Sequence, residues 1–561
     1  MERKIGVYIC ECGPNIAEKI DIDTVIKAIT PLDDVVVVEK FKLLCSTEGK
    51  EFLGKEITKH KLTHLVVAAC SPKEHEKTFM TVCEQASLNP YLFQLANIRE
   101  QCAWITDDKD EATAKAIRLI KAAIGRVRYH SPLEKKEIDS NPDVLVIGGG
   151  IAGIETALQL ASPQRTVYLV EKSASLGGVV QHFEKVFDDM MPTKDLLQKK
   201  VQAIEQNEHI KVFTESTVDE AIGFFGNFEI KVASTTQQDT FVSFDVGAIV
   251  IAIGAALYDL SSLKAFGYGT IDNVVSSLDF EQMNASGAIT LKNGRPPTSV
   301  ALIHCVGRTD VGYCSDVCCL YSLKHARYLK EKVPKASIIH FYSDLCIPGK
   351  AHQQFYEDTK SPQVNFLRSH DIKLTKQKDQ IRISYSTEQH KQKTTDVDMV
   401  ILAPAIVPAD DATTVAEITG ISQGETGFFS EEHEKLNPIS TATDGIYIVG
   451  CAHGPKNIAD SIIQSEAASG KILSALIPGR KLEPEVKTST ISESLCIGCK
   501  TCLEVCSYGA ISYDEKKNIS VVNEVICRGC GNCVAACPSG AARIKHFNFN
   551  QLYQELVEAM K

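Results

Sequence analysis

Eight cysteines near the C-terminus have the spacing of an iron–sulfur site. They form two runs of four with identical spacing, and Pro538 follows the second run. In such a run the first three cysteines hold a [4Fe-4S] cluster, and the fourth reaches the other cluster. The alternative, a pair of zinc knuckles, fits less well because zinc sites use pairs of cysteines. We predict one cluster on Cys496, Cys499, Cys502 and Cys537. The second predicted cluster has the ligands Cys527, Cys530, Cys533 and Cys506.

A glycine pattern after an apolar segment indicates a dinucleotide-binding unit. Residues 143–147 (DVLVI) precede Gly148-x-Gly150-x-x-Gly153, and a helix-like stretch and a second strand ending in Glu171 follow. The three glycines would allow, in that order, a tight turn, the approach of a pyrophosphate and close packing of the helix. Glu171 lies where an acidic residue binds a ribose hydroxyl.

Two later segments favour FAD as the dinucleotide. Residues 244–255 and 443–469 resemble flavin-binding segments of thioredoxin-reductase-type flavoproteins, as does the Gly177-Gly178 turn. In these enzymes the last segment closes over the flavin ring. Alternatively, residues 443–469 are only another strand and helix. The predicted FAD-binding residues are Gly148, Gly150, Gly153, Glu171, Lys172, Gly178, Gly254, Gly450, Lys456 and Ile458.

A third group of cysteines stands where such enzymes bind a nicotinamide nucleotide. The candidate strand 299–305 should end in a second glycine-rich turn, but it ends in a cysteine, and three more cysteines follow. Without those glycines a pyrophosphate cannot approach the backbone, so we expect no nicotinamide there. We predict a [4Fe-4S] site instead, with buried free thiols as the alternative. The predicted ligands are Cys305, Cys314, Cys318 and Cys319.

The amino-terminal region has three candidate strands, 6–10, 35–45 and 64–70, that end at cysteines. Helical stretches separate them, and parallel strands joined by helices present their carboxyl ends at one edge of a sheet. We therefore predict a further [4Fe-4S] site, although core cysteines or redox-active thiols also fit the irregular spacing. The predicted ligands are Cys10, Cys12, Cys45 and Cys70. We treat Cys83 and Cys102 as structural.

These sites require an α/β chain of several domains, because 561 residues exceed the size of one hydrophobic core. We predict a thioredoxin-reductase-like FAD domain with an N-terminal α/β cluster domain before it and a C-terminal ferredoxin-like domain with two [4Fe-4S] clusters after it. The predicted boundaries are 1–135 for the N-terminal domain, 140–482 for the FAD domain with a degenerate nicotinamide subdomain at about 275–400, 486–547 for the ferredoxin-like domain and 548–561 for a C-terminal helix.

The composition of the chain limits which partners and which cellular compartment we expect. The formal net charge of −11 provides no basic surface for nucleic acid. No apolar run approaches the roughly 20 residues of a membrane span, and residues 1–9 begin a strand rather than a signal peptide. Twenty cysteines in so long a chain indicate metal binding in a reducing compartment rather than disulfides. We expect a cytoplasmic protein without a transmembrane segment or a nucleic-acid partner.

Several segments together resemble the A subunit of heterodisulfide reductase, the FAD and iron–sulfur protein of electron-bifurcating complexes. They are IGVYICECGPNIA, AACSPKEHEKTF, NPYLFQLANIREQCAW, VIGGGIAG, YCSDVCCLYSLKHA, GCAHGPKNIADSI and the C-terminal cysteine runs. The resemblance implies FAD, four [4Fe-4S] clusters and a flavin that splits electron pairs between two chains. It also implies, as partners, other subunits of such a complex and ferredoxin or hydrogenase- or formate-dehydrogenase-type electron donors. A homodimer is a further expectation.

The resemblance also assigns two residues to the reaction centre. Lys324 matches a lysine that the family places near flavin N5, where a cation would stabilise the reduced flavin. A surface lysine on an amphipathic helix is the alternative. Glu281 matches the acidic partner of that lysine.

The chain departs from longer family members, which carry an additional ferredoxin domain inserted in the flavoprotein part. Residues 200–300 contain no cysteine, so this chain is a short form that lacks one electron route. Bifurcation therefore does not follow from the resemblance alone.

Two other functions compete with that of an electron-transferring subunit. One is a stand-alone NAD(P)H:ferredoxin-type oxidoreductase resembling the small subunit of glutamate synthase, and the other is a wiring scaffold with an inert flavin.

Overall fold

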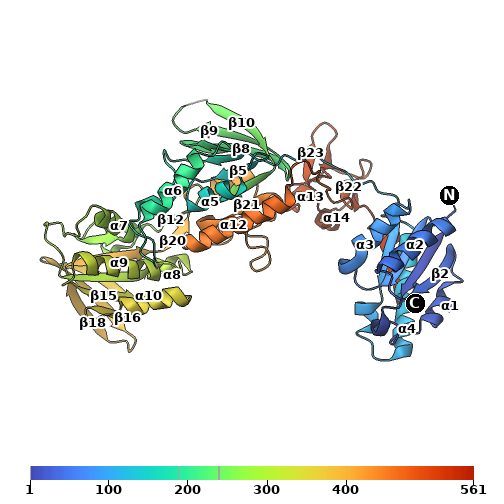
Figure 1. Ribbon diagram of the computed structural model, residues 1–561, viewed down its shortest axis with the longest axis horizontal. Helices are drawn as coiled ribbons and strands as arrows, with labels where there is room; N and C mark the ends of the chain where they lie inside the picture. The colour runs from blue at the N-terminus through green and yellow to red at the C-terminus, as the bar shows by residue number, and fades with distance from the viewer. Residues whose placement is uncertain (1, 188, 238–239) are drawn as a thin grey trace. The chain divides into compact units, whose positions relative to one another are not determined.

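The chain folds into two compact units, shown as a computed structural model in Figure 1. Residues 2–187, 189–237 and 240–561 are described. One unit combines residues 1–138 with residues 483–561, and the other comprises residues 139–482. Among the helices of the described residues, none is long and apolar enough to cross a membrane.

The N-terminal domain is a parallel four-stranded sheet between two layers of helices. The sheet has the order β2-β1-β3-β4, and its strands are β1 (Ile5–Cys10), β2 (Val35–Phe41), β3 (His64–Ala69) and β4 (Phe93–Asn97). One face packs on α1 (Ile22–Ile29) and α4 (Lys109–Val127), and the other on α2 (Thr47–His60) and α3 (Pro72–Gln85). Strands β1 and β3 are buried along their whole length, as expected for strands covered on both faces.

The second predicted strand is shorter than residues 35–45. Strand β2 ends at Phe41, so Cys45 lies in the loop before α2 rather than on the strand. The hydroxyl of Ser46 caps α2 by accepting a hydrogen bond from the Gly49 N–H. This cap fixes where the helix begins, immediately after the cysteine.

The first half of the second unit is built around a five-stranded parallel sheet of order β21-β11-β5-β6-β7. Its strands are β5 (Val144–Ile147), β6 (Val167–Val170), β7 (Ile210–Phe213), β11 (Ala248–Ile251) and β21 (Ile446–Ile448). Helices α5 (Ile151–Leu160) and α12 (Ile458–Ala475) cover one face. An antiparallel sheet of β8 (Ser216–Phe224), β9 (Asn227–Ser234) and β10 (Phe241–Val246) covers the other. Helix α6 (Thr193–Glu205) packs against α5.

The second half of this unit contains a seven-stranded sheet of order β13-β19-β14-β15-β16-β17-β18. Its strands are β13 (Val274–Ser276), β14 (Ser299–Val306), β15 (Ser337–Tyr342), β16 (Val364–Gln377), β17 (Gln380–Thr387), β18 (Gln392–Val397) and β19 (Met399–Pro404). Helices α7 (Ser277–Ala285) and α9 (Cys318–Lys332) pack on it. Strands β12 (Ala255–Leu257) and β20 (Ile406–Pro408) pair where the chain passes between the two halves (Figure 1).

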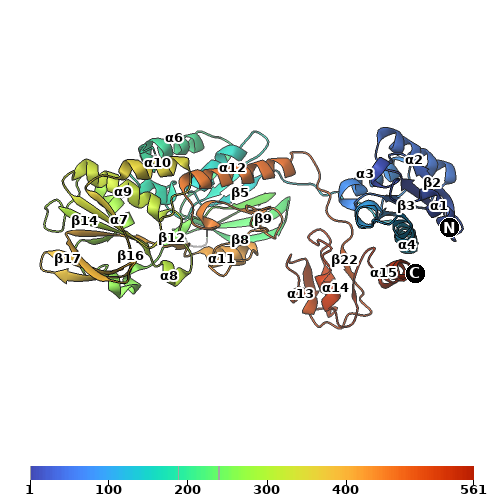
Figure 2. The same cartoon turned by 90° about the horizontal axis from the view of Figure 1, so that it is seen from below.

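The C-terminal segment consists of short elements around the two cysteine runs. Strand β22 (Ser489–Ile491) pairs with β25 (Ala542–Ile544), and β23 (Ile511–Asp514) pairs with β24 (Ile519–Val522). The short helices α13 (Thr501–Glu504) and α14 (Asn532–Ala536) follow the cysteine turns. The last helix, α15 (Phe549–Met560), lies against α4 of the N-terminal domain (Figure 2), where Arg126 Nη1 contacts Glu555 Oε2 at 2.6 Å.

A stacked pair of histidines, the buried His546 and the half-buried His130, supports this docking of α15. His130 and His546 stack with ring centroids 4.3 Å apart, and their ring nitrogens contact the carbonyl oxygens of Tyr91 and Ser131. Burial, reinforced by His546, lowers the pKa of His130 from 6.5 to about 3. Between these two values the undocked chain binds more protons, so docking is complete above about pH 6.5 and weakens as the pH falls.

We therefore expect hydrogen exchange in α15 to accelerate when the pH is lowered from 7.5 to 5, after correction for the intrinsic rate. The shift of His130 corresponds to a loss of about 2 kcal/mol at pH 5. Replacing His130 by asparagine should reduce this pH dependence, and the part that remains belongs to His546, whose pKa burial also lowers. The same replacement of the exposed His390 should not change it. An unaltered pH dependence in the His130→Asn variant would contradict the assignment.

Candidate functional site

The glycine-rich turn after β5 is shaped for a phosphate. Gly148 has φ = +108°, and a Cβ there would lie 2.4 Å from the carbonyl oxygen of Ala252. A Cβ at Gly153 would lie 1.8 Å from the carbonyl oxygen of Gly148, so α5 packs tightly on the turn. Gly150 is the N-cap of α5, and no side chain caps this end of the helix. The first N–H groups of α5 are therefore free to bind an anion.

The acidic residue at the end of β6 lies beside this turn. The buried carboxylate of Glu171 accepts hydrogen bonds from the N–H groups of Gly149 at 2.6 Å and Ser173 at 2.8 Å. The Gly177 N–H donates to the carbonyl oxygen of Gly149 at 2.8 Å, so the second glycine turn, with Gly178, meets the first. Lys172 points elsewhere, because its exposed ammonium pairs with Asp411.

The segment 443–469 packs on the first turn of α5. A Cβ at Gly450 would lie 3.0 Å from the Cβ of Ala152, and the Ser465 hydroxyl donates to the carbonyl oxygen of Ala152 at 2.9 Å. Ile458 begins α12, whose N-terminus is capped by Asn457. Lys456 is mostly buried, and burial lowers its pKa. The segment therefore packs on the glycine turn, as a flavin-binding segment would.

The glycine turns leave space of the kind that FAD needs. Nothing lies within 4 Å of a Cβ built at Gly254, which follows β11, and the nearest atom to a Cβ at Gly150 is the Cα of Gly178 at 4.0 Å. An uncapped helix end, a buried acidic residue and an open backbone thus meet at the carboxyl ends of parallel strands. These residues fit a dinucleotide.

Three cysteines of the third group line one hollow at the end of β14. Cys305, Cys314 and Cys318 surround about 200 Å³ of space together with Arg308 and residues 403–405. Cys305 has φ = +58°, an uncommon conformation for a residue with a side chain and one that occurs at functional sites. The neighbouring Cys318 thiol and burial both raise the pKa of Cys305.

The fourth cysteine of this group, Cys319, is buried beside the hollow, and its sulfur accepts a hydrogen bond from the Cys346 N–H at 3.4 Å. Cys346 was not among the predicted residues, and its thiol donates to Asp316 Oδ1 at 2.5 Å. Cys346 follows β15, the parallel neighbour of β14. The rule that such strands end at one edge could have identified it.

The N-terminal cysteines lie at the carboxyl edge of their sheet. Cys10 ends β1, Cys70 follows β3, and Cys12 has φ = +43°. Burial raises the pKa of Cys10, and the nearby thiols of Cys12 and Cys45 raise it further. Burial also raises the pKa of Cys70 to about 11, with a contribution from Cys10. The structure thus brings these four cysteines together.

Arg99 supplies a cation at this edge that was not predicted from the sequence. It follows β4, and its Nη1 lies 3.8 Å from the sulfur of Cys12. The single tryptophan, Trp104, covers its guanidinium at 4.9 Å. Cys83 and Cys102 are buried in the cores on the two faces of the sheet, and Cys83 shares its core with Cys10 and Cys70.

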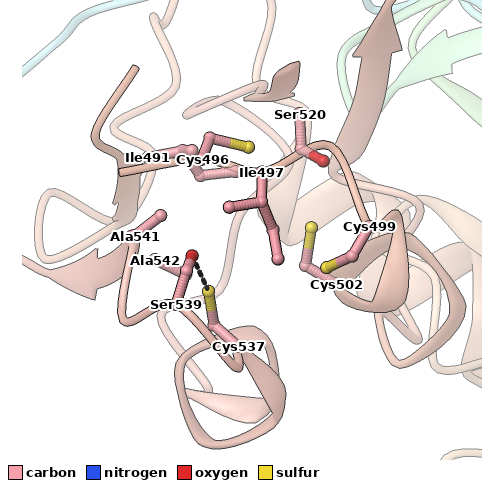
Figure 3. A pocket seen from close by; sticks show the side chains of 10 residues that line it. All are labelled: Ile491, Cys496, Ile497, Cys499, Cys502, Ser520, Cys537, Ser539, Ala541 and Ala542. Atoms are coloured by element: carbon pink, nitrogen blue, oxygen red, sulfur yellow. Dashed lines mark hydrogen bonds between the residues drawn. The ribbon is translucent and has the colours of Figure 1, made fainter. Parts of the chain in front are cut away.

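The C-terminal cysteines are grouped across the two runs. Cys496, Cys499 and Cys502 border a hollow of about 300 Å³, and Cys537 of the second run faces them (Figure 3). The thiol of Cys533 lies near Cys527, Cys530 and Cys506, which contribute to raising its pKa after burial. Backbone N–H groups already point at sulfur, from Ser489 to Cys527 and from Ala510 to Cys506, each at 3.3 Å.

The cysteine sulfurs of the described residues are not gathered around a single zinc position. Zn–S bonds of about 2.3 Å place the sulfurs of a tetrahedral site about 3.8 Å from one another. Among the described residues, no three cysteine sulfurs lie within 4.8 Å of one another. The wider spacing fits a cluster of several metal ions better than a zinc knuckle.

Lys324 lies in a buried polar group between α7, α9 and residues 184–185. Its Nζ contacts Glu281 Oε1 at 2.7 Å and donates to the carbonyl oxygen of Lys185 at 2.9 Å. Lys324 is 3% exposed and Glu281 2%, so Lys324 is not a surface lysine.

His325 is the second partner of Glu281, and neither the spacing nor the resemblance indicated it. Its Nε2 lies 2.9 Å from Glu281 Oε1. Burial raises the pKa of Glu281, but the hydrogen bonds and charges of His325 and Lys324 outweigh burial and hold it at about 2. Burial lowers the pKa values of Lys324 and His325. The carboxylate is therefore ionised at neutral pH, between a lysine and an imidazole.

Comparisons with known proteins agree over the whole chain. Residues 142–465 match the family described as pyridine nucleotide-disulphide oxidoreductase, and residues 495–541 match the 4Fe-4S dicluster domain. The chain is 36% identical to an iron-sulfur A subunit of the CoB--CoM heterodisulfide reductase of Methanopyrus kandleri, over 100% of this chain and 99% of the relative. It is 33% identical to the A subunit of the H(2):CoB-CoM heterodisulfide,ferredoxin reductase of Methanothermobacter thermautotrophicus, over 92% and 91%.

Among solved structures, the thioredoxin reductase of Lactococcus lactis aligns with 60% of this chain and 99% of its own at 17% identity and a TM-score of 0.43. The alignment with the Methanopyrus kandleri relative runs over 655 positions, more than the 561 residues of this chain. That relative therefore contains residues without a counterpart here.

Proposed function

This chain belongs to the family of heterodisulfide reductase A subunits, and we propose that it binds one FAD and four [4Fe-4S] clusters and passes electrons between partner proteins. That the chain is a flavin and iron–sulfur oxidoreductase subunit follows from its family and its two domain matches. The observation that carries the fuller proposal is the cysteine-lined hollow at the end of β14, where a second nucleotide-binding turn would otherwise lie.

The FAD would be held by the two glycine turns, the first turn of α5 and Glu171. Bound FAD exchanges electrons in pairs or singly, which links two-electron and one-electron carriers. The uncapped end of α5 would bind the pyrophosphate, and Glu171 a ribose hydroxyl. Segment 443–469, with Gly450 and Lys456, would shield the ring system from water.

Sixteen cysteines would hold the clusters in four sets. Two sets are the crossed groups of the C-terminal runs, the third is the group of Cys305, and the fourth is the N-terminal group. Arg308 and Arg99 lie beside the last two sets. A cation there favours the electron-rich state of a cluster and so raises its reduction potential.

Lys324 would act as the cation near the flavin, with Glu281 as its partner. Because Glu281 also contacts His325, the lysine shares this carboxylate and is fixed at Nζ by the carbonyl oxygen of Lys185. The ammonium is held in one place and kept dry, which strengthens its effect on a nearby charge.

The partners would be other subunits of a heterodisulfide-reductase-like complex, with ferredoxin or hydrogenase- or formate-dehydrogenase-type donors. Relatives in Methanothermobacter are named for heterodisulfide and ferredoxin, which supports electron bifurcation or confurcation as the working hypothesis. This shorter chain would lack one electron route of the longer relatives, and a homodimer would bring a second set of clusters into the complex.

The decisive measurement is the content of iron, sulfide and FAD per chain after anaerobic purification. We expect about sixteen iron atoms, from four clusters of four, with one FAD. A content of about eight iron atoms per chain would mean that the Cys305 group and the N-terminal group hold no cluster.

Addition of NADH or NADPH to the purified chain tests the competing oxidoreductase. The proposal predicts that the flavin absorbance persists, because the turn after β14 offers no second phosphate-binding glycine pattern. Rapid bleaching by either nucleotide would favour the stand-alone enzyme.

A further inference from the structure

Three side chains with metal-ligand chemistry meet in the N-terminal domain, away from its cysteines. They are Glu39 on β2 and Glu56 and His60 on α2, and one ligand atom of each lies within 4.8 Å of the other two. In the part of the chain that the structure describes, no other set of three such groups is as close. Figures 1 and 2 both show β2 and α2 as neighbours.

The backbone aims these side chains at one point. Glu39 pairs with Tyr8 in the parallel register of β1 and β2, so both side chains lie on the same face of the sheet. Helix α2 covers this face, where Leu53 and Ile57 pack with Tyr8. Glu56 and His60 are four residues apart on α2 and thus share one side of the helix.

Three buried polar atoms of this group make no hydrogen bond among the described residues. Glu56 is 7% exposed, and its Oε2 makes no hydrogen bond. The Nε2 of His60 lies 3.1 Å from this oxygen, at ion-pair distance, but also makes no hydrogen bond. The Tyr8 hydroxyl, fully buried, is the third unpartnered atom. These oxygen and nitrogen atoms lie close together without hydrogen bonds to one another, which is how metal ligands are arranged around a common centre.

The electrostatics of the group favour a cation. Two carboxylates lie close together, and Lys59, at 2.9 Å from Glu56 Oε1, offsets part of their charge. Burial raises the pKa of Tyr8, and the charges of Glu56 and Glu39 raise it further, which places the tyrosine hydroxyl in the same negative potential. His60 is in the last turn of α2, where the helix dipole also attracts positive charge.

We propose that Glu39, Glu56 and His60 bind a single divalent first-row cation, with the Tyr8 hydroxyl beside it. Two carboxylate oxygens and one imidazole nitrogen suit Mn²⁺, Fe²⁺ or Zn²⁺ and leave positions open for water. The cation would clamp β2 to the last turn of α2. These two elements flank the loop of residues 42–46, so the clamp would steady Cys45 within the N-terminal cysteine group.

Mn²⁺ is the best probe, because it prefers oxygen ligands and avoids the twenty thiols. In the oxidised holoprotein the clusters give no EPR signal. The decrease of the EPR signal of free Mn²⁺ on addition of this protein therefore gives the number of bound Mn²⁺ ions. We expect wild-type protein to bind one Mn²⁺ more than the Glu39→Gln and His60→Ala variants, or to bind it at least about tenfold more tightly. Glu51→Gln, an exposed position on α2, is the matched control and should behave like wild type.

Two measurements keep the test decisive. Unchanged iron and FAD contents show that a variant is folded, and Mn²⁺ should raise the unfolding temperature of wild type and control but not of the two variants. Equal Mn²⁺ binding by wild type and both variants would overturn the proposal and leave His60 as an ion-pair partner of Glu56.

Discussion

Replacing Cys318 by alanine is expected to remove about four iron atoms per chain while FAD remains bound. Cys318 lines the same hollow as Cys305 and Cys314, so one missing thiolate leaves an incomplete ligand set. The glycine turns that fit FAD are carried by β5 and α5, which belong to the other sheet of this unit. Iron analysis and flavin absorbance of the anaerobically purified variant measure both outcomes.

Cys346→Ala is the matched control for this variant. Cys346 lies next to the same group, where its N–H rather than its sulfur contacts Cys319. Removing its thiol should leave the iron content unchanged, because alanine retains the backbone N–H. Unchanged iron in Cys318→Ala would refute that ligand assignment, and an equal loss in Cys346→Ala would place Cys346 in the ligand set.

The predicted fold class is confirmed by the two domain matches and by the parallel sheets with covering helices. The fold class could be predicted because it is encoded in short, local sequence patterns. The run of apolar residues, glycines and helix after residue 143 specifies one unit, and the cysteine runs specify another without long-range information. The crossed grouping of Cys537 with Cys496 follows from the same local spacing.

What the sequence could not provide depends on contacts between distant elements. Arg99 reaches Cys12 because β4 pairs with β3, which in turn pairs with β1, and β4 was not among the predicted strands. Cys346 joins the Cys305 group through the pairing of β14 with β15. The sequence VVVVEKFKLLC continues with apolar residues past Phe41, so Cys45 was predicted to lie on the strand. In the structure the strand ends at Phe41, and Cys45 lies in the loop just before Ser46, the N-cap of α2.

Lys324→Met is expected to lower the midpoint potential of the flavin and to destabilise the FAD-binding unit. The lost cation no longer stabilises the added electrons, and a change of about 1.4 kcal/mol moves a two-electron couple by about 30 mV. Glu281 would also remain buried without its cation, which costs about 3–5 kcal/mol when one member of a buried pair is removed. Redox titration and the temperature of flavin release measure the two effects.

Two further variants separate the effect on the flavin from the effect on stability. Lys332→Met, on the same helix α9 but paired with Glu184 nearer the surface, should change neither quantity strongly. The double variant Lys324→Met/Glu281→Gln should recover stability, since no uncompensated charge remains, but not the potential. A wild-type potential in Lys324→Met would show that the lysine serves only as a partner of Glu281.

The pH dependence of the same variants tests whether Lys324 holds the charge of Glu281. With its pKa at about 2 against 4.5 in the unfolded chain, Glu281 contributes its full stability above about pH 4.5 and loses it only as the pH falls toward 2. Without Lys324, the charge and hydrogen bond of the lysine disappear, and burial raises the pKa of the carboxyl. The temperature of flavin release should then begin to fall at a higher pH in Lys324→Met than in wild type, whereas the double variant, which has no carboxyl at this position, should lack that added loss. Superimposable profiles of Lys324→Met and wild type would mean that His325 and the backbone N–H of Glu184 are sufficient to keep Glu281 ionised.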